Sequence, residues 1–166
     1  MPDSILVGYS TVYGSTREVA EAIAEILRKG GQKVDLLPAR EVRSLEGYRA
    51  VVLGAPLYMM RWHKDANRFL SRHSKELATM PVAIFALGPF HNKEEELQSA
   101  GEHLDKSLNK FPWLKPITKE VFVGKFDPTA LKFPYSMIGP LKEMPASDER
   151  NWEDIHTWAN NLTELL

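Results

Sequence analysis

The sequence predicts a doubly wound α/β fold, and two observations lead to this prediction. Short apolar runs alternate along the chain with segments that have helical periodicity. The runs are apolar at successive positions rather than at alternate ones, which is typical of parallel strands buried on both faces. The length of 166 residues is enough for one domain with a core of its own. We therefore expect a single domain over residues 1–166.

Five runs have the length of a strand and contain β-branched or aromatic residues. They cover residues 5–9, 34–37, 50–54, 82–87 and 120–126. Parallel pairing of these strands requires helical crossovers between them.

Four segments have apolar residues at the spacing of a helix face. They cover residues 19–27, 66–77, 94–111 and 152–162. Between the last strand and the last helix lies an irregular insertion at about 127–151, rich in proline and methionine. We expect this insertion either to cover a ligand or partner site, or to bury its apolar groups against the sheet edge, and the second interpretation is favoured because its prolines oppose helix formation.

Composition and charge exclude several classes of function. A net charge of −1 without a basic block gives no basis for binding nucleic acid. The chain has no cysteine, which excludes disulfides and thiolate chemistry, and no metal-binding or hydrolase motif appears. The start of the sequence does not resemble a signal peptide, and no apolar run approaches the roughly 20 residues of a transmembrane helix. We expect a cytoplasmic protein without a metal or a transmembrane segment.

The loop after the first strand has the composition of a phosphate site. In doubly wound sheets, ligands bind beyond the carboxyl ends of the strands, and a helix N-terminus offers unpaired N–H groups and a partial positive charge. Neighbouring hydroxyls add further hydrogen bonds. The candidate residues are Ser10, Thr11, Val12, Tyr13, Gly14, Ser15 and Thr16. The alternative is plain capping, in which Ser15 or Thr16 starts the helix near Glu18, and the loop alone does not decide between the two.

Three other nucleotide-binding patterns are absent from this part of the chain. The loop has one glycine, so it lacks the G-x-G-x-x-G of dinucleotide sites. It also lacks the lysine of a P-loop. A phosphoacceptor domain of the same winding would need an acidic residue after the third strand, where this chain has Gly54-Ala55-Pro56.

The remaining pattern resembles the flavodoxin family. The loop S-T-V-Y-G-S-T is similar to the T-x-T-G-x-T-like loop with which flavodoxins hold the phosphate of FMN, with Tyr13 where a threonine is usual. The resemblance implies a flavodoxin-like five-stranded parallel sheet, in the order 2-1-3-4-5 with helices on both faces. It also implies FMN as the cofactor.

Two further loops at strand ends are candidates for holding the flat flavin ring between aromatic or apolar walls. The candidates are Pro56, Leu57, Tyr58, Met59, Arg61, Trp62 and His63 after the third strand, and Leu87, Gly88, Pro89, Phe90 and His91 after the fourth. The alternative is that Trp62 packs on its own helix and that Phe90 covers the edge of the core. Arg61 and His63, taken singly, have the character of solvated surface charges.

One branch of the family is more similar to this chain than the electron-carrying flavodoxins. The menaquinone-dependent protoporphyrinogen IX dehydrogenases have a similar opening, STVYGSTRE at 10–18 here, a basic and aromatic second loop, and an acid–tryptophan helix start, DERNWED at 148–154 here. This resemblance implies removal of electrons from a porphyrinogen and their delivery to a quinone, and a weak peripheral contact with a membrane. Two alternatives stay open: an electron carrier between redox partner proteins, and an interaction module that no longer binds flavin.

Two features of the candidate ring-binding loops help to distinguish an electron carrier from an enzyme. Basic residues there, such as Arg61, Lys64 and Lys93, suit a small anionic substrate such as a porphyrinogen. The run 57–63 has no glycine, and a non-glycine residue that enters the left-handed conformation costs roughly 1–2 kcal/mol. In flavodoxin carriers, a glycine of this loop turns its peptide over to accept a hydrogen bond from the one-electron-reduced ring. The resemblance therefore implies that this form is weakly stabilised here and that two-electron chemistry is easier than in a dedicated carrier. No catalytic residue is assigned, although His63 or His91 is a candidate proton donor.

Overall fold

Five parallel strands form the centre of the molecule in a computed structural model that describes residues 2–89, 91–126, 137, 139–143 and 146–166. Their order across the sheet is β2-β1-β3-β5-β6, so the predicted arrangement of the five parallel strands, 2-1-3-4-5, is confirmed. The strands are β1 (Ser4–Tyr9), β2 (Lys33–Pro38), β3 (Tyr48–Tyr58), β5 (Val82–Leu87) and β6 (Thr118–Phe122). The short strand β4 (Arg61–Trp62) turns back antiparallel to the end of β3.

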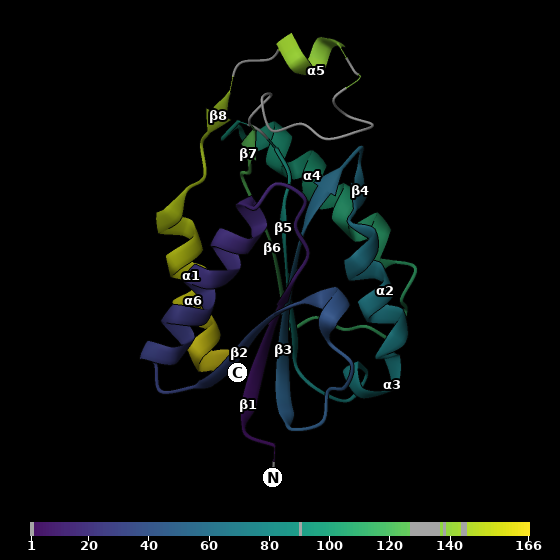
Figure 1. Ribbon diagram of the computed structural model, residues 1–166, viewed down its shortest axis with the longest axis vertical. Helices are drawn as coiled ribbons and strands as arrows, with labels where there is room; N and C mark the ends of the chain where they lie inside the picture. Colours follow the sequence, from purple (N-terminus) through teal and green to yellow (C-terminus); the bar gives the residue numbers. More distant parts are fainter. Residues whose placement is uncertain (1, 90, 127–136, 138, 144–145) are drawn as a thin grey trace.

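Helices cover both faces of this sheet (Figure 1). One face carries α1 (Ser15–Lys29) and α6 (Trp152–Leu165), and the other carries α2 (Lys64–Arg72), α3 (Ser74–Leu77) and α4 (Glu94–Leu108). A single 3₁₀ turn, η1 (Ala39–Glu41), follows β2. None of the helices in the described residues is both long and apolar enough to cross a membrane.

The successive apolar residues of the strands are explained by the two helical layers. In β1, Ile5 and Val7 face the cluster that contains α1 and α6, whereas Leu6 faces the cluster that contains α2 and α4. All three side chains are fully buried. Because neighbouring residues of a strand point to opposite faces, a strand covered on both sides has to be apolar at every position.

Two of the predicted elements are each divided into two in the structure. The run 120–126 is not one strand: β6 ends at Phe122, and β7 (Lys125–Phe126) leaves the sheet to pair with β8 (Ser147–Asp148). The segment 66–77 is broken at His73, whose backbone ends α2 with φ −106° and ψ 25° and precedes α3. In both cases the apolar spacing continues across a backbone turn, so the spacing alone does not reveal the break.

The insertion lies only partly within the described residues. It contains α5 (Gly139–Glu143) and β8, and Met137 is 73% exposed. The other apolar residues of the insertion, apart from Leu141 on α5, lie outside the described residues: Leu131, Phe133, Tyr135, Ile138 and Met144. The helix α5 is an element that the sequence did not predict.

Candidate functional site

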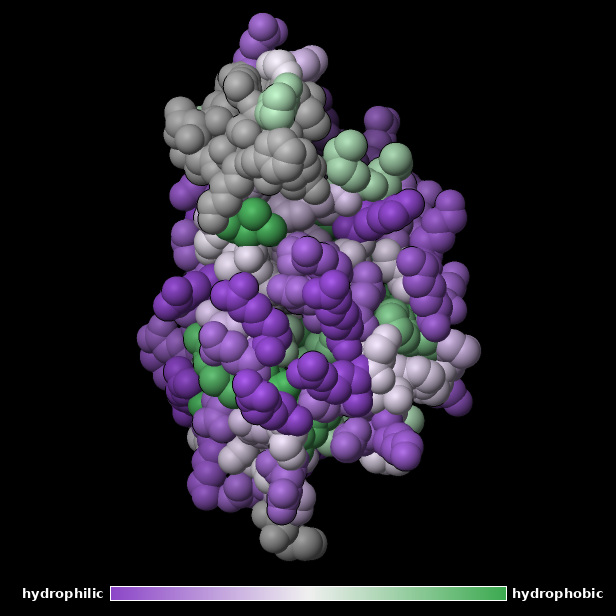
Figure 2. All heavy atoms as spheres, turned by 45° about the vertical axis from the view of Figure 1, so that its right-hand side comes forward, coloured by the Kyte–Doolittle hydropathy of each residue, from purple (hydrophilic) through white to green (hydrophobic). Residues whose placement is uncertain are grey.

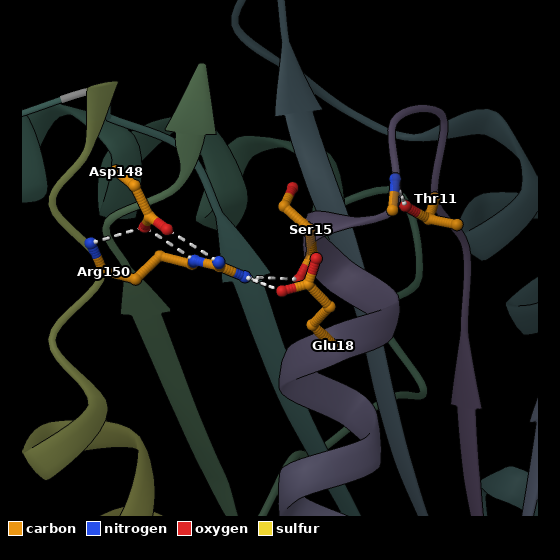
Figure 3. Close-up of polar contacts among 6 residues, drawn as sticks. Thr11, Ser15, Glu18, Asp148 and Arg150 are labelled. Carbon is orange, nitrogen blue, oxygen red and sulfur yellow. Dashed lines mark hydrogen bonds and ion pairs between the residues drawn. The ribbon is translucent and has the colours of Figure 1, made fainter. Parts of the chain in front are cut away.

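The turn after β1 lies at the carboxyl ends of the strands, and the backbone of β3 holds its start. The N–H of Ser10 donates to the carbonyl of Gly54 at 3.0 Å, which continues the contact between β1 and β3. The N–H of Gly14 donates to the hydroxyl of Thr11 at 2.8 Å, which closes the turn on itself (Figure 3). Gly14 adopts the left-handed conformation with φ 91°, and α1 begins directly after it.

Ser15 begins α1, as the plain capping interpretation expected, but neither its side chain nor that of Thr16 caps the helix. Gly14 is the N-cap, and no side chain of the described residues caps α1. The carboxylate of Glu18 does not reach back to the cap as in a capping box; it lies 3.0 Å from the guanidinium of Arg150. The N–H groups of the first turn are therefore available to a ligand, and the helix dipole makes that end favourable for an anion.

Two buried hydroxyls of the turn have no hydrogen-bond partner within the described part of the chain. They are the Oγ of Ser10, a residue that is 5% exposed, and the Oγ1 of Thr16, which is fully buried. A buried hydroxyl without a partner costs about 1–3 kcal/mol. A phosphate group fits this set, because it can accept hydrogen bonds from both hydroxyls and from the uncapped helix N-terminus.

Tyr13 connects this turn to the second candidate loop. Its ring lies edge-on to the ring of Tyr58, with centroids 6.1 Å apart and planes at 80°. Tyr58 is the last residue of β3. The two tyrosines thus form an aromatic contact between the turn 10–16 and the loop after β3, which is expected to hold the flavin ring.

The second loop is a tight hairpin. Leu57 pairs with Trp62 and Tyr58 with Arg61, which leaves Met59 and Met60 as its two-residue turn. Both methionines adopt the left-handed conformation, with φ 50° and 65°, as a type I′ turn requires. The two residues are 67% and 68% exposed. Figure 2 shows one face of the molecule, where hydrophilic side chains predominate and smaller apolar patches lie among them.

The hairpin differs from one expectation drawn from the sequence, which concerns the backbone conformation of the loop. The left-handed conformation was expected to be costly for a loop without glycine, yet two non-glycine residues already adopt it in the folded chain. The cost of about 1–2 kcal/mol per residue therefore belongs to the fold. That two-electron chemistry is easier here stays a prediction.

We expect Met60→Gly to raise the free energy of unfolding by about 1 kcal/mol. Glycine relieves about 1–2 kcal/mol of left-handed strain, and its greater freedom in the unfolded chain removes part of this gain. Urea unfolding measures the difference, with Met60→Ala as the control, since alanine removes the same exposed side chain but keeps Cβ. Equal urea midpoints for the glycine and alanine variants would show that the turn is not strained.

Trp62 does not offer an exposed ring, so that expectation is wrong. The residue is 2% exposed and belongs to the core on the α2 and α4 side. Its indole N–H donates to the carbonyl of Ala55 at 3.0 Å, and its backbone N–H donates to the hydroxyl of Ser107 at 3.3 Å. The short hairpin turns the chain back before Trp62, and its pairing with Leu57 directs the ring inward. The alternative interpretation, a packed tryptophan, describes this residue.

The basic residues of the hairpin differ in their surroundings. Arg61 is exposed. His63 is the N-cap of α2, and its Nδ1 accepts the N–H of Asp65 at 3.2 Å. Burial lowers the pKa of His63, so the neutral ring is favoured and acts as an acceptor. Its structural role as a cap does not support the suggestion that it donates protons.

The third candidate loop is held by backbone bonds to the end of the sheet. The N–H of Gly88 donates to the carbonyl of Phe122 at 3.1 Å, and the carbonyl of Pro89 accepts from Gly124 at 2.8 Å. His91 lies 3.4 Å from Glu96 at the start of α4. Phe90 lies outside the described residues.

The hairpin and this third loop meet at a pocket of about 240 Å³. Leu57 and Met60 line it from the hairpin side, and Gly88 and Pro89 from the loop after β5. Part of α4 closes its other side. The pocket thus brings together three candidate residues, Leu57, Gly88 and Pro89, at the same edge of the sheet as the turn 10–16.

Arg150 lies beside the turn, and the sequence did not indicate it as a site residue. Its side chain is 4% exposed and contacts the first turn of α1 from the other end of the chain. The segment DERNWED was noticed only as a helix start. A contact across 132 positions leaves no local signal in spacing or periodicity.

A model of the flavodoxin domain matches residues 6–145 of this chain. The chain belongs to this flavodoxin family. Its fold and redox class are those of a flavodoxin-type protein, as the resemblance implied. A search of solved structures gives the same fold: a flavodoxin from the domain Archaea has a TM-score of 0.60 at 12% identity, with 98% of this chain and 97% of that one covered. A mutant flavodoxin of Pseudomonas aeruginosa has a TM-score of 0.61 at 13% identity, with 98% of each chain covered.

Among curated proteins, the flavodoxin-family chain is similar to the protoporphyrinogen IX dehydrogenase (quinone) of Escherichia coli. The two are 25% identical over an alignment 175 positions long, which covers 96% of this chain and 94% of that protein. The likeness thus extends over nearly the whole of both chains.

Proposed function

We propose that this flavodoxin-family protein binds FMN, with the phosphate in the turn 10–16 and the ring between the hairpin after β3 and the loop after β5. The observation that carries the proposal is the pair of buried hydroxyls without partners, Ser10 Oγ and Thr16 Oγ1, beside the uncapped start of α1. A fold that leaves both donors unpaired is destabilised unless a ligand accepts from them. An FMN phosphate has the required acceptor oxygens and the charge that a helix N-terminus favours.

When bound, FMN would supply the redox chemistry of the site, which is electron transfer from a donor to an acceptor. The residues of the chain hold and shield it. Ser10, Thr11, Ser15 and Thr16, together with the backbone N–H groups of the turn, would hold the phosphate. The Tyr13–Tyr58 pair and the apolar side chains Leu57 and Pro89 would exclude water from the ring side.

We propose further that a porphyrinogen is the electron donor and a quinone the acceptor. The similarity to the Escherichia coli enzyme over nearly the full length of both chains supports this assignment. Two exposed basic residues beside the ring loops, Arg61 and Lys64, would attract the carboxylates of such a substrate. In contrast, a carrier that docks on basic partners would need an acidic rim at this place.

An electron carrier is the second candidate. One observation favours it: the two solved flavodoxins named above match this chain over 97% and 98% of their own length, so the chain is similar to theirs in extent. An interaction module that has lost the flavin is the third candidate, and it requires that the turn 10–16 binds no FMN.

We expect the apoprotein to bind FMN with a dissociation constant in the micromolar range or below, measured by quenching of flavin fluorescence. Riboflavin, which lacks the phosphate, is the matched control, and we expect it to bind at least about 100-fold more weakly because charge-assisted bonds contribute about 1.5–3 kcal/mol each. Absence of quenching by FMN would leave only the interaction module. Equal affinity for FMN and riboflavin would contradict the phosphate assignment of the turn.

An anaerobic assay of the FMN-loaded protein distinguishes the enzyme from the electron carrier. Mixed with protoporphyrinogen and a quinone analogue, the protein is expected to turn over with formation of the porphyrin. Absence of turnover, combined with rapid reduction by a ferredoxin-type reductase, would favour the carrier.

A further inference from the structure

Arg150 lies buried between the C-terminal part of the chain and the first turn of α1 (Figure 3). It follows β8 and precedes α6, and its side chain is 4% exposed. Its guanidinium binds both oxygens of Asp148 at 2.8 Å each, and its Nη1 lies 3.0 Å from the carboxylate of Glu18. The same Nη1 lies 3.5 Å from the carbonyl of Ser15, the first residue of the helix.

These contacts hold the guanidinium from several directions. Its central carbon lies 4.9 Å from the centroid of the Trp152 ring, so the cation also rests on an aromatic face. Hydrogen bonding to Arg150 lowers the pKa of Asp148, and hydrogen bonding to Asp148 raises the pKa of Arg150. Each partner of the Arg150–Asp148 pair therefore favours the charged form of the other, and the carboxylate of Glu18 lies against the same guanidinium.

The position of these charges matters for an anion at the turn. Glu18 belongs to the first turn of α1, whose N–H groups form the phosphate-type site. Without Arg150, the negative charges of Glu18 and Asp148 would stand uncompensated beside that site. They would repel a phosphate group and weaken the favourable effect of the helix dipole.

We propose that Arg150 is a positioning residue for the phosphate of the cofactor: it offsets part of the negative charge of Glu18 and Asp148 beside the first turn of α1 and connects β8 to that turn. The inference rests on the proposed function, in which the turn 10–16 holds the phosphate. Arg150 acts on the phosphate through Glu18 and the backbone of Ser15.

The geometry requires arginine rather than a generic cation. Two parallel hydrogen bonds to Asp148 and a third to Glu18 use three separate nitrogens of the guanidinium. Lysine has a single nitrogen at the end of a flexible stem, so it would compensate charge without holding both carboxylates in place. Arg150→Lys is therefore expected to bind FMN with an affinity between those of the wild type and Arg150→Met.

The test compares FMN affinities of four proteins: the wild type, Arg150→Met, Arg150→Met/Glu18→Gln, and the control Lys33→Met. Lys33 pairs with Asp3 at 2.6 Å at the start of β2, the opposite end of the sheet from the turn, so its loss changes the net charge equally. We expect about 10- to 100-fold weaker binding in Arg150→Met, no change in the control, and recovery of at least about threefold in the double variant. Equal affinities of Arg150→Met and the double variant would overturn the electrostatic role.

A second measurement reads the connection between β8 and α1 without FMN. Hydrogen exchange of the apoprotein is expected to be faster at residues 15–18 and 147–152 in Arg150→Met than in the wild type. Unchanged exchange there would overturn the connecting role. If Arg150→Met does not fold, Arg150→Lys with and without Glu18→Gln replaces it in both measurements.

The two proposals can fail separately. If the wild type binds no FMN, the proposed function and the phosphate role of Arg150 are both refuted. If the wild type and Arg150→Met bind FMN with equal affinity, only the inference about Arg150 is overturned.

Discussion

Thr16→Val is expected to stabilise the apoprotein and weaken FMN binding at the same time. The Thr16 hydroxyl is fully buried and has no partner among the described residues. Valine has nearly the same shape but no polar atom, so the substitution removes an unpaired buried group. We expect a gain of about 1 kcal/mol in the free energy of unfolding and about 10- to 100-fold weaker FMN binding.

The opposite signs distinguish a ligand-binding hydroxyl from a structural one. A hydroxyl that serves only the fold would have a partner in the apoprotein, and its loss would lower stability. Thr118→Val is the matched control: the Thr118 hydroxyl accepts the indole N–H of Trp158 at 3.1 Å, away from the turn. This control is expected to unfold at lower urea concentration and to bind FMN as the wild type does.

Urea unfolding of the apoprotein and quenching of flavin fluorescence measure the two effects separately. A Thr16→Val protein that is less stable than the wild type would show that the hydroxyl has a structural partner. A more stable variant that binds FMN equally well would place the phosphate elsewhere.

The central sheet could be predicted from the sequence because burial on both faces leaves a direct pattern. Ile5, Leu6 and Val7 are apolar in succession and fully buried, as a strand covered by helices on both faces requires. Strand ends were less predictable. The third strand was expected to end at Gly54, yet β3 continues to Tyr58. Proline is tolerated there because β1 has already ended beside Gly54, and the carbonyl of Pro56 accepts from His63 of the returning chain.

The candidate site was predictable where the chemistry is local. The turn 10–16 is a continuous segment, so its hydroxyls and its glycine were visible together. The hairpin was not, because its turn consists of Met59 and Met60 instead of the usual asparagine and glycine. Without that turn, the inward direction of Trp62 could not be inferred. Arg150 was hidden for a different reason, since its partner Glu18 is distant in the sequence and only the folded chain brings them together.

Gly54→Ala is expected to lower the free energy of unfolding by about 3 kcal/mol, at the upper end of the range for an overpacked core. Gly54 stands opposite Phe85 in the pairing of β3 with β5. A Cβ at Gly54 would lie 1.9 Å from the ring of Phe85, a distance at which atoms must move. The ring has little room, because it is fully buried and packs against Phe122 and Trp158 at centroid distances of 6.2 and 5.9 Å.

The same substitution should also disturb the site, because the carbonyl of Gly54 accepts the N–H of Ser10 at the start of the phosphate-type turn. Urea unfolding tests the packing argument with two companions. Gly101→Ala on α4, where a Cβ would meet no atom of the described residues within 4 Å, is expected to raise stability by about 0.5–1 kcal/mol. Adding Phe85→Leu to Gly54→Ala should recover part of the loss, since the smaller side chain makes space for the new methyl group. Wild-type stability of Gly54→Ala would mean that the strand pair can separate at this point, and the close approach of Gly54 to Phe85 would then have no role in setting the position of the turn.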